Sequence, residues 1–193
     1  MYSENMNTPI TLAVIAGSAR PGRQSIKAAR YVAEFGKRYE DVEIILVDPT
    51  EFLFPGDGND AEGKDSRYGD IVARADAFFI VTPEYNHSFP GSLKRMLDSE
   101  YSAYFHKPVA LAGVSNGPWG GVRVCEALLP VCHRLGLVNI LPELYFPKVQ
   151  DIFDEEGVMH EQFKEMYDQN IAKSYDELLW FARTLKATRD EAR

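Results

Sequence analysis

The sequence has few cysteines, and the two that it has, Cys125 and Cys132, exclude a disulfide framework. They lie seven residues apart in a segment that predicts one helix, so roughly 10 Å of helix axis separates them, too far for a disulfide. The four histidines show no ligand spacing, and we therefore expect no metal site. Two buried thiols in a reduced, cytoplasmic protein are the interpretation that we favour.

Basic residues and long apolar runs are also scarce. Lys and Arg number 21 against 29 Asp and Glu, which disfavours nucleic acid as a partner because phosphate binding needs clustered cations. No apolar run approaches the ~20 residues of a membrane helix, and residues 1–8 lack the basic and apolar regions of a signal peptide. We expect no contact with a membrane. The length favours one domain over residues 1–193, with 1–8 as a disordered extension.

Apolar runs alternate with helical patterns along the chain. The runs predict five strands, at Ile10–Ala16, Val42–Val47, Ala77–Val81, Pro108–Val114 and Leu137–Leu141. Apolar spacing predicts helices near 26–35, 66–74, 88–104, 122–135 and 163–185. Strands that are apolar throughout and alternate with helices predict a parallel sheet covered on both faces.

Smaller signals refine this pattern. Ser66 is a candidate cap for its helix, and Pro130 predicts a kink within the helix that Gly136 should end. The segment 50–63, rich in Gly, Pro and acidic residues, predicts a long surface loop.

Three loops are expected at the carboxyl end of the sheet, where ligands bind in this class of fold: 17–25, 82–90 and 115–121. The first leads directly into a helix, whose N-terminus offers unpaired N–H groups and a partial positive charge to a phosphate. Ser18 and Ser25 can donate hydroxyl hydrogen bonds there, and Arg20 can reach a phosphate oxygen. The loop lacks both the P-loop and the G-x-G-x-x-G motif, so by composition alone it is equally a well-capped turn.

The second loop carries a more specific signal. It reads P-E-Y-N-H-S-F-P-G-S-L-K, which resembles the signature of the NADPH-dependent FMN reductase family, whose members include azo-dye, quinone and chromate reductases. G-S-A-R-P-G-R in the first loop and S-N-G-P-W-G-G-V-R in the third resemble the same family at the matching places. The resemblance covers about Ile10 to Gly136. With the strand pattern, it implies a flavodoxin-like three-layer α/β/α fold with a five-stranded parallel sheet in the order 2-1-3-4-5.

The resemblance also implies which residues bind FMN. The first loop would hold the phosphate through Ser18, Arg20, Gln24 and Ser25. The second would lie along the isoalloxazine ring through Pro83, Glu84, Tyr85 and Asn86. The third would cover the pyrimidine end through Ser115, Asn116, Gly117 and Gly120, since a planar ring can approach a backbone without Cβ atoms.

The implied reaction is ping-pong hydride transfer. NAD(P)H would reduce FMN, and a planar acceptor (a quinone, an azo compound, a free flavin or an oxidised metal ion) would then replace the nicotinamide. We assign no catalytic side chain, because hydride transfer to a flavin needs orientation more than a protein acid or base. The family further implies a homodimer or homotetramer, and acceptor choice could depend on the acidic loop 50–65. A flavodoxin-like electron carrier and a flavin-free binding or regulatory module stay open as alternatives.

Five residues beside these loops admit two interpretations. His87 is either catalytic or a backbone or subunit contact, and Glu84 is either a general base or, as we favour, a cap for nearby N–H groups. Tyr85 and Trp119 either stack on a ring or fill the core. Arg123 either binds the phosphate of the nicotinamide nucleotide or is an ordinary exposed helix arginine.

Overall fold

The computed structural model describes residues 9–55 and 64–191, so the predicted extension 1–8 and much of the loop 50–65 lie outside the described residues. At the centre is a parallel sheet built on β1 (Ile10–Ala16), β2 (Val42–Val47), β3 (Ala77–Pro83) and β4 (Pro108–Val114). Its strand order is β2-β1-β3-β4-β5. Both the parallel sheet and its order are confirmed.

The fifth strand differs from the prediction of one strand over 137–141. It is divided into β5 (Val138–Asn139) and β6 (Leu144–Phe146), and both pieces pair in parallel with β4. Pro142 lies between them and has no N–H to give to a strand ladder. The second piece brings the chain to the carboxyl end of β4, beside the third loop.

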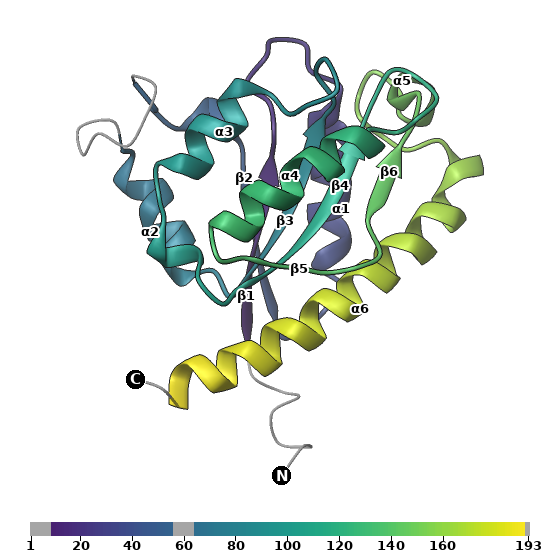
Figure 1. The fold of residues 1–193 in the computed structure, drawn as a ribbon. Helices are drawn as coiled ribbons and strands as arrows, with labels where there is room; N and C mark the ends of the chain where they lie inside the picture. The colour runs from purple at the N-terminus through teal and green to yellow at the C-terminus, as the bar shows by residue number, and fades with distance from the viewer. Residues whose placement is uncertain (1–8, 56–63, 192–193) are drawn as a thin grey trace.

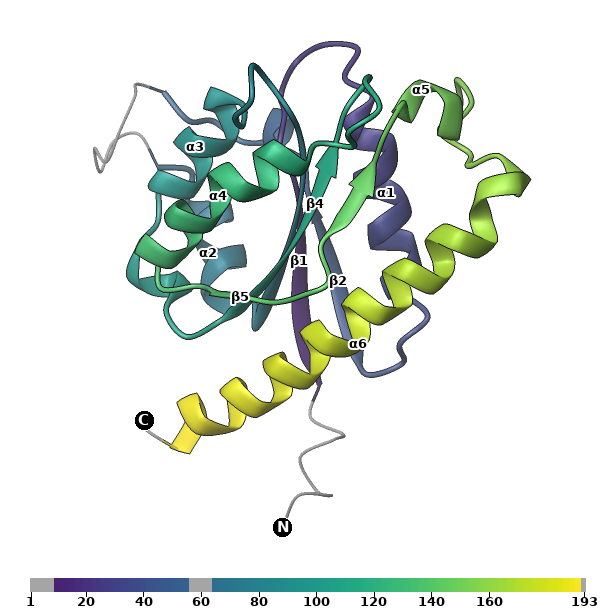
Figure 2. The same cartoon turned by 45° about the vertical axis from the view of Figure 1, so that its right-hand side comes forward.

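Helices cover both faces of the sheet (Figures 1 and 2). α1 (Ser25–Gly36) and the long α6 (Glu161–Glu191) pack on one face. The other face is covered by α2 (Ser66–Arg74), α3 (Gly91–Asp98) and α4 (Val122–Arg134). The short elements are the 3-10 helices Pro49–Glu51 and Ser102–Tyr104 and the helix α5 (Val149–Ile152).

The strands alternate between two apolar clusters, one on each face. In β1, Leu12 and Val14 pack on the side of α1 and α6, while Ala13 and Ile15 pack on the side of α2, α3 and α4. All four residues are buried. Two covered faces explain why the strands are apolar throughout rather than alternating with polar residues.

The helix ends correct two predictions in detail. Asp65, not Ser66, caps α2, because its carboxylate accepts the Arg67 N–H at 3.0 Å. α3 ends at Asp98, earlier than predicted, and the chain continues into the 3-10 turn. α4 runs through Pro130 to Arg134, and Gly136 follows its end with a φ of 71°, as its role as a helix terminator requires.

Candidate functional site

The three predicted loops meet at one cavity of about 570 Å³. It lies at the carboxyl end of the sheet, opposite the end where β1 begins and α6 ends (Figure 1). Nine of the twelve predicted site residues line it: Arg20, Gln24, Ser25, Pro83, Glu84, Tyr85, Asn86, Ser115 and Asn116. Four residues that are not among the predicted site residues also line it: Gly22, Arg23, Val114 and Val149.

The first loop joins the end of β1 to the start of α1. The Gly17 N–H donates to the carbonyl of Val81 at 2.8 Å, and a Cβ at Gly17 would collide with the side chain of Thr82. The Gln24 side chain makes no capping hydrogen bond at the start of α1. The first-turn N–H groups of this helix therefore have no capping side chain, which suits an anion in the cavity.

An ion pair between Arg23 and Asp48 holds the first loop. Arg23 Nη2 lies 2.7 Å and 2.5 Å from the two carboxylate oxygens of Asp48, which directly follows β2. Burial alone would raise the pKa of Asp48, but hydrogen bonds from Thr50 and the charge of Arg23 outweigh it and hold that pKa below its usual value. Asp48 is therefore a carboxylate that stays charged beside the cavity wall.

The second loop is a tight turn from Tyr85 to Ser88. Their backbones bond in both directions, at 2.8 Å and 3.0 Å, and Asn86 and His87 have φ values of 50° and 65°. Two consecutive positive φ values are typical of a type I′ turn. The turn fixes Tyr85 and Asn86 on the cavity, whereas His87 is exposed and is not among the lining residues, which argues against a catalytic role.

The third loop is held by the segment that follows β6. Ser115 donates its N–H to Phe146 at 3.1 Å and accepts the Val149 N–H at 3.1 Å. The carbonyl of Gly117 accepts the Lys148 N–H at 3.0 Å. These bonds hold Val149 beside the third loop, where it lines the cavity. No motif in the sequence signals that contact.

Three predicted residues do not line the cavity. Ser18 is buried, and its Oγ accepts the Arg20 N–H at 3.2 Å and lies 3.0 Å from the Tyr85 hydroxyl. Gly117 instead uses its carbonyl within the third loop. Gly120 packs against β6, since a Cβ there would lie 2.8 Å from that of Tyr145. The glycine is required at that position for packing rather than for the approach of a ring.

The structure also shows the surroundings of Glu84, Trp119 and Arg123. Glu84 Oε1 lies 3.4 Å from Arg123 Nη1, and within the described residues its carboxylate accepts no backbone N–H, so the expected capping role is not seen. Trp119 is 66% exposed and belongs neither to the core nor to the cavity lining. Arg123, in the first turn of α4, links that helix to the second loop through its contact with Glu84.

Both cysteines, Cys125 and Cys132, are buried free thiols. Burial raises the pKa of both thiols, that of Cys132 to about 12, which fits packing residues. Among residues 9–55 and 64–191, no group of three or more His, Cys, Asp or Glu side chains could hold a metal ion. No helix in that part of the chain is long and apolar enough to cross a membrane.

Comparisons with known proteins agree on one family. Residues 10–151 match the family model of NADPH-dependent FMN reductases. A quinone reductase of Pseudomonas putida is 28% identical over 166 residues, covering 81% of this chain and 88% of the relative. An NAD(P)H-dependent FMN reductase of Schizosaccharomyces pombe is 31% identical over 156 residues, covering 73% of this chain and 77% of the relative.

Solved structures show the same fold. A flavoenzyme NAD(P)H:acceptor oxidoreductase from Paracoccus denitrificans superposes with a TM-score of 0.72 at 24% identity, covering 88% of this chain and 97% of the other. An archaeal flavodoxin superposes with a TM-score of 0.59 at 12% identity, covering 92% and 99%. The flavodoxin-like fold is confirmed.

Proposed function

This chain belongs to the NADPH-dependent FMN reductase family, whose members are oxidoreductases that use FMN and NAD(P)H, and we propose that it reduces planar acceptors at the cavity between its three loops. When bound, FMN would supply the redox chemistry, which is hydride uptake from NAD(P)H and electron delivery to the second substrate. Quinones are the first acceptor class to test, because a quinone reductase aligns with 81% of the chain.

The cavity fits FMN in size and in chemistry. Its volume of about 570 Å³ is within the range of roughly 300–1,000 Å³ for small-molecule sites. Arg20, Gln24 and Ser25 come from the first loop, at the start of α1, where the Gln24 side chain makes no capping hydrogen bond, which suits a phosphate. Pro83 and Tyr85, from the end of β3 and the second loop, offer apolar surface to a ring.

The protein's part in the reaction is to hold and to orient. The turn from Tyr85 to Ser88 and the bonds of Ser115 fix the backbone of two loops, so they can present N–H and C=O groups to the edges of a ring without rearranging. This rigid convergence of three loops on one cavity is the observation that carries the proposal. In this proposal, the nicotinamide and the acceptor bind in turn at one shared face of the bound flavin.

Initial-rate kinetics test the shared face. With NAD(P)H varied at several fixed quinone concentrations, double-reciprocal plots should be parallel, and excess NAD(P)H should inhibit competitively with the quinone. A flavodoxin-like carrier would instead show a negligible stopped-flow rate with NAD(P)H. Converging plots without donor inhibition would mean that donor and acceptor occupy separate places.

We also propose that the protein is a cytoplasmic homodimer or homotetramer. Tyr101, Phe105, Trp119 and Val122 are exposed apolar side chains near the ends of α3 and α4, and contact between copies would cover them. Light scattering on the purified holoprotein measures the mass in solution, and a monomer would contradict this proposal.

A further inference from the structure

Arg23 lines the cavity, and the hydrogen-bonding capacity of its guanidinium is not fully used by the protein. Its side chain is 13% exposed, and Nη2 is engaged by Asp48. Nη1 makes only a long contact of 3.5 Å with the carbonyl of Arg20, and Nε is buried without a partner in the described residues. A buried cation with unfilled hydrogen-bonding capacity is costly, and an anion beside it would offset that cost.

Asp48 fixes the direction of this guanidinium, and Asp48 is itself held by Thr50. Asp48 accepts the Thr50 N–H at 3.0 Å and the Thr50 hydroxyl at 2.8 Å, so its carboxylate is held by the backbone turn that follows β2. The carboxylate therefore does not depend on Arg23 for its orientation. Arg23, by contrast, depends on Asp48.

The surroundings of Arg23 show which anion would fit. Gln24 and Ser25, the next residues along the chain, also line the cavity, and the helix that starts there has no side-chain cap. A cation, a hydroxyl and first-turn N–H groups on one wall form a site for a phosphate.

We propose that Arg23 contacts the FMN phosphate through Nη1, and that Asp48 is the positioning residue that orients it. The inference rests on the proposed function and adds two residues to it. Arg20, the cation implied by the family resemblance, is exposed and makes no side-chain hydrogen bond among the described residues. Arg23 is already ordered, so less conformational entropy is lost when it binds an anion.

Paired titrations of FMN and riboflavin test Arg23, because the two ligands differ only in the phosphate. Arg23→Ala should weaken FMN binding at least about tenfold in a flavin-fluorescence titration and change riboflavin binding less than about twofold. Arg23→Lys, which keeps the charge but loses the planar fork, should weaken FMN several-fold. Arg30→Ala removes the same charge from an exposed site on α1 and should change neither affinity.

Asp48→Asn gives opposite signs for the two possible roles of the ion pair. If Arg23 acted only through its charge, removing the neighbouring negative charge would tighten FMN binding. If Asp48 positions Arg23, FMN binding should weaken several-fold while riboflavin binding is kept, which also shows that the variant is folded. Tighter FMN binding would overturn the positioning role.

Two results of these titrations distinguish a wrong role for Arg23 from a wrong phosphate site. Equal affinity of the unmodified protein for FMN and riboflavin would contradict the proposed phosphate site as a whole. A preference for FMN that survives intact in both Arg23→Ala and Arg23→Lys would overturn only the role of Arg23.

Discussion

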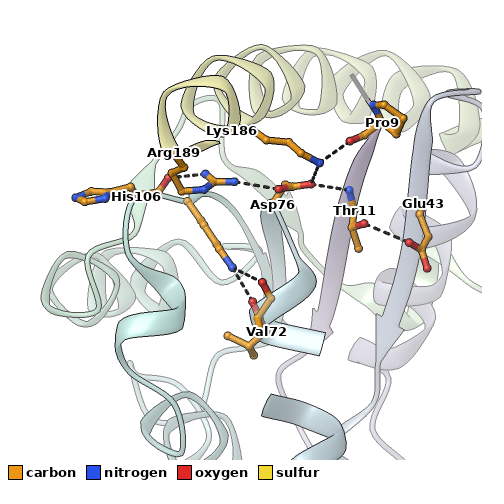
Figure 3. A network of polar contacts seen from close by, with 10 residues as sticks. Pro9, Thr11, Glu43, Val72, Asp76, His106, Lys186 and Arg189 are labelled. Atoms are coloured by element: carbon orange, nitrogen blue, oxygen red, sulfur yellow. Dashed lines mark hydrogen bonds and ion pairs between the residues drawn. The ribbon is translucent and has the colours of Figure 1, made fainter. Parts of the chain in front are cut away.

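At the carboxyl end of the sheet, polar side chains line a cavity, whereas at the amino end they bond to one another (Figure 3). Asp76 is the centre of the second arrangement. Its carboxylate accepts the Thr11 N–H at 3.1 Å, Lys186 Nζ at 2.7 Å and Arg189 Nη2 at 2.9 Å. Arg189 also donates to the carbonyl of His106 at 2.8 Å.

These bonds join the last turns of α6 to the first residues of the sheet. Lys186 reaches the carbonyl of Pro9 at 2.8 Å, next to β1. Lys107 donates to the carbonyls of Val72 and Ala73 at 2.7 Å and 3.1 Å, which ties the end of α2 to the chain that enters β4. Asp76 and Lys107 are both buried, and each has protein partners.

The comparison of the amino and carboxyl ends of the sheet indicates where a ligand is expected. Protein partners satisfy the charges of Asp76 and Lys107 at the amino end, so these two residues contribute to stability. At the cavity, Arg20 is exposed, the start of α1 is uncapped and the Arg23 guanidinium is incompletely paired. A site that must bind and release a ligand keeps such groups available, at some expense of stability.

The largest expected effect lies at the amino end. Asp76→Asn should lower the free energy of unfolding by about 3 kcal/mol, because it leaves two cations around a buried position without their carboxylate. Urea denaturation measures the loss, and Asp70→Asn, at an exposed position, should stay within about 0.5 kcal/mol of the unmodified protein. FMN affinity of the folded variant should not change. A tenfold loss of FMN affinity would show that the two ends are coupled.

Arg20→Ala should have the reverse profile. The loss of a charge-assisted hydrogen bond of roughly 1.5–3 kcal/mol should weaken FMN at least about tenfold, while the free energy of unfolding stays within about 0.5 kcal/mol. Arg74→Ala removes an arginine whose only ion pair within residues 9–55 and 64–191 is an exposed one with Glu43, and it should leave FMN binding intact. Unchanged FMN binding in Arg20→Ala would remove this residue from the phosphate site.

Much of the carboxyl end could be predicted from the sequence, because each element there has a local signal. The run Ile10–Ala16 is nearly unbroken in apolar residues, and the Gly-rich segment after it leads straight into a helix, so the first loop follows from pattern alone. The fifth strand could not be predicted as it is. Pro142 marks an interruption, but no pattern in the sequence shows that the strand stops as early as Asn139 and resumes at Leu144 on the same partner.

Contacts between distant segments were the part that sequence patterns could not supply. Arg23 and Asp48 are 25 residues apart, and neither belongs to a motif that names the other. Asp76 is bonded to residues up to 113 positions away along the chain. Such pairs depend on the register of strands and the length of α6, which exceeds its apolar stripe at both ends.

The smallest expected effect concerns Ser18, which the family resemblance assigns to the phosphate. The structure places it behind the cavity wall, where its Oγ joins the backbone of Arg20 to the hydroxyl of Tyr85. We expect it to brace the first loop against the second rather than to contact the ligand. Ser18→Ala should then weaken flavin binding by about 1 kcal/mol, or roughly fivefold.

The choice of ligand and a second variant decide between the two roles. A brace acts on the whole site, so Ser18→Ala should weaken FMN and riboflavin equally, and Tyr85→Phe, which removes the other hydroxyl of the pair, should give a similar loss. A phosphate ligand acts on FMN alone. If Ser18→Ala weakens FMN fivefold, leaves riboflavin unchanged and differs from Tyr85→Phe, then Ser18 turns toward the phosphate when FMN binds. The cavity wall would in that case be less rigid than the hydrogen bonds of the two loops indicate.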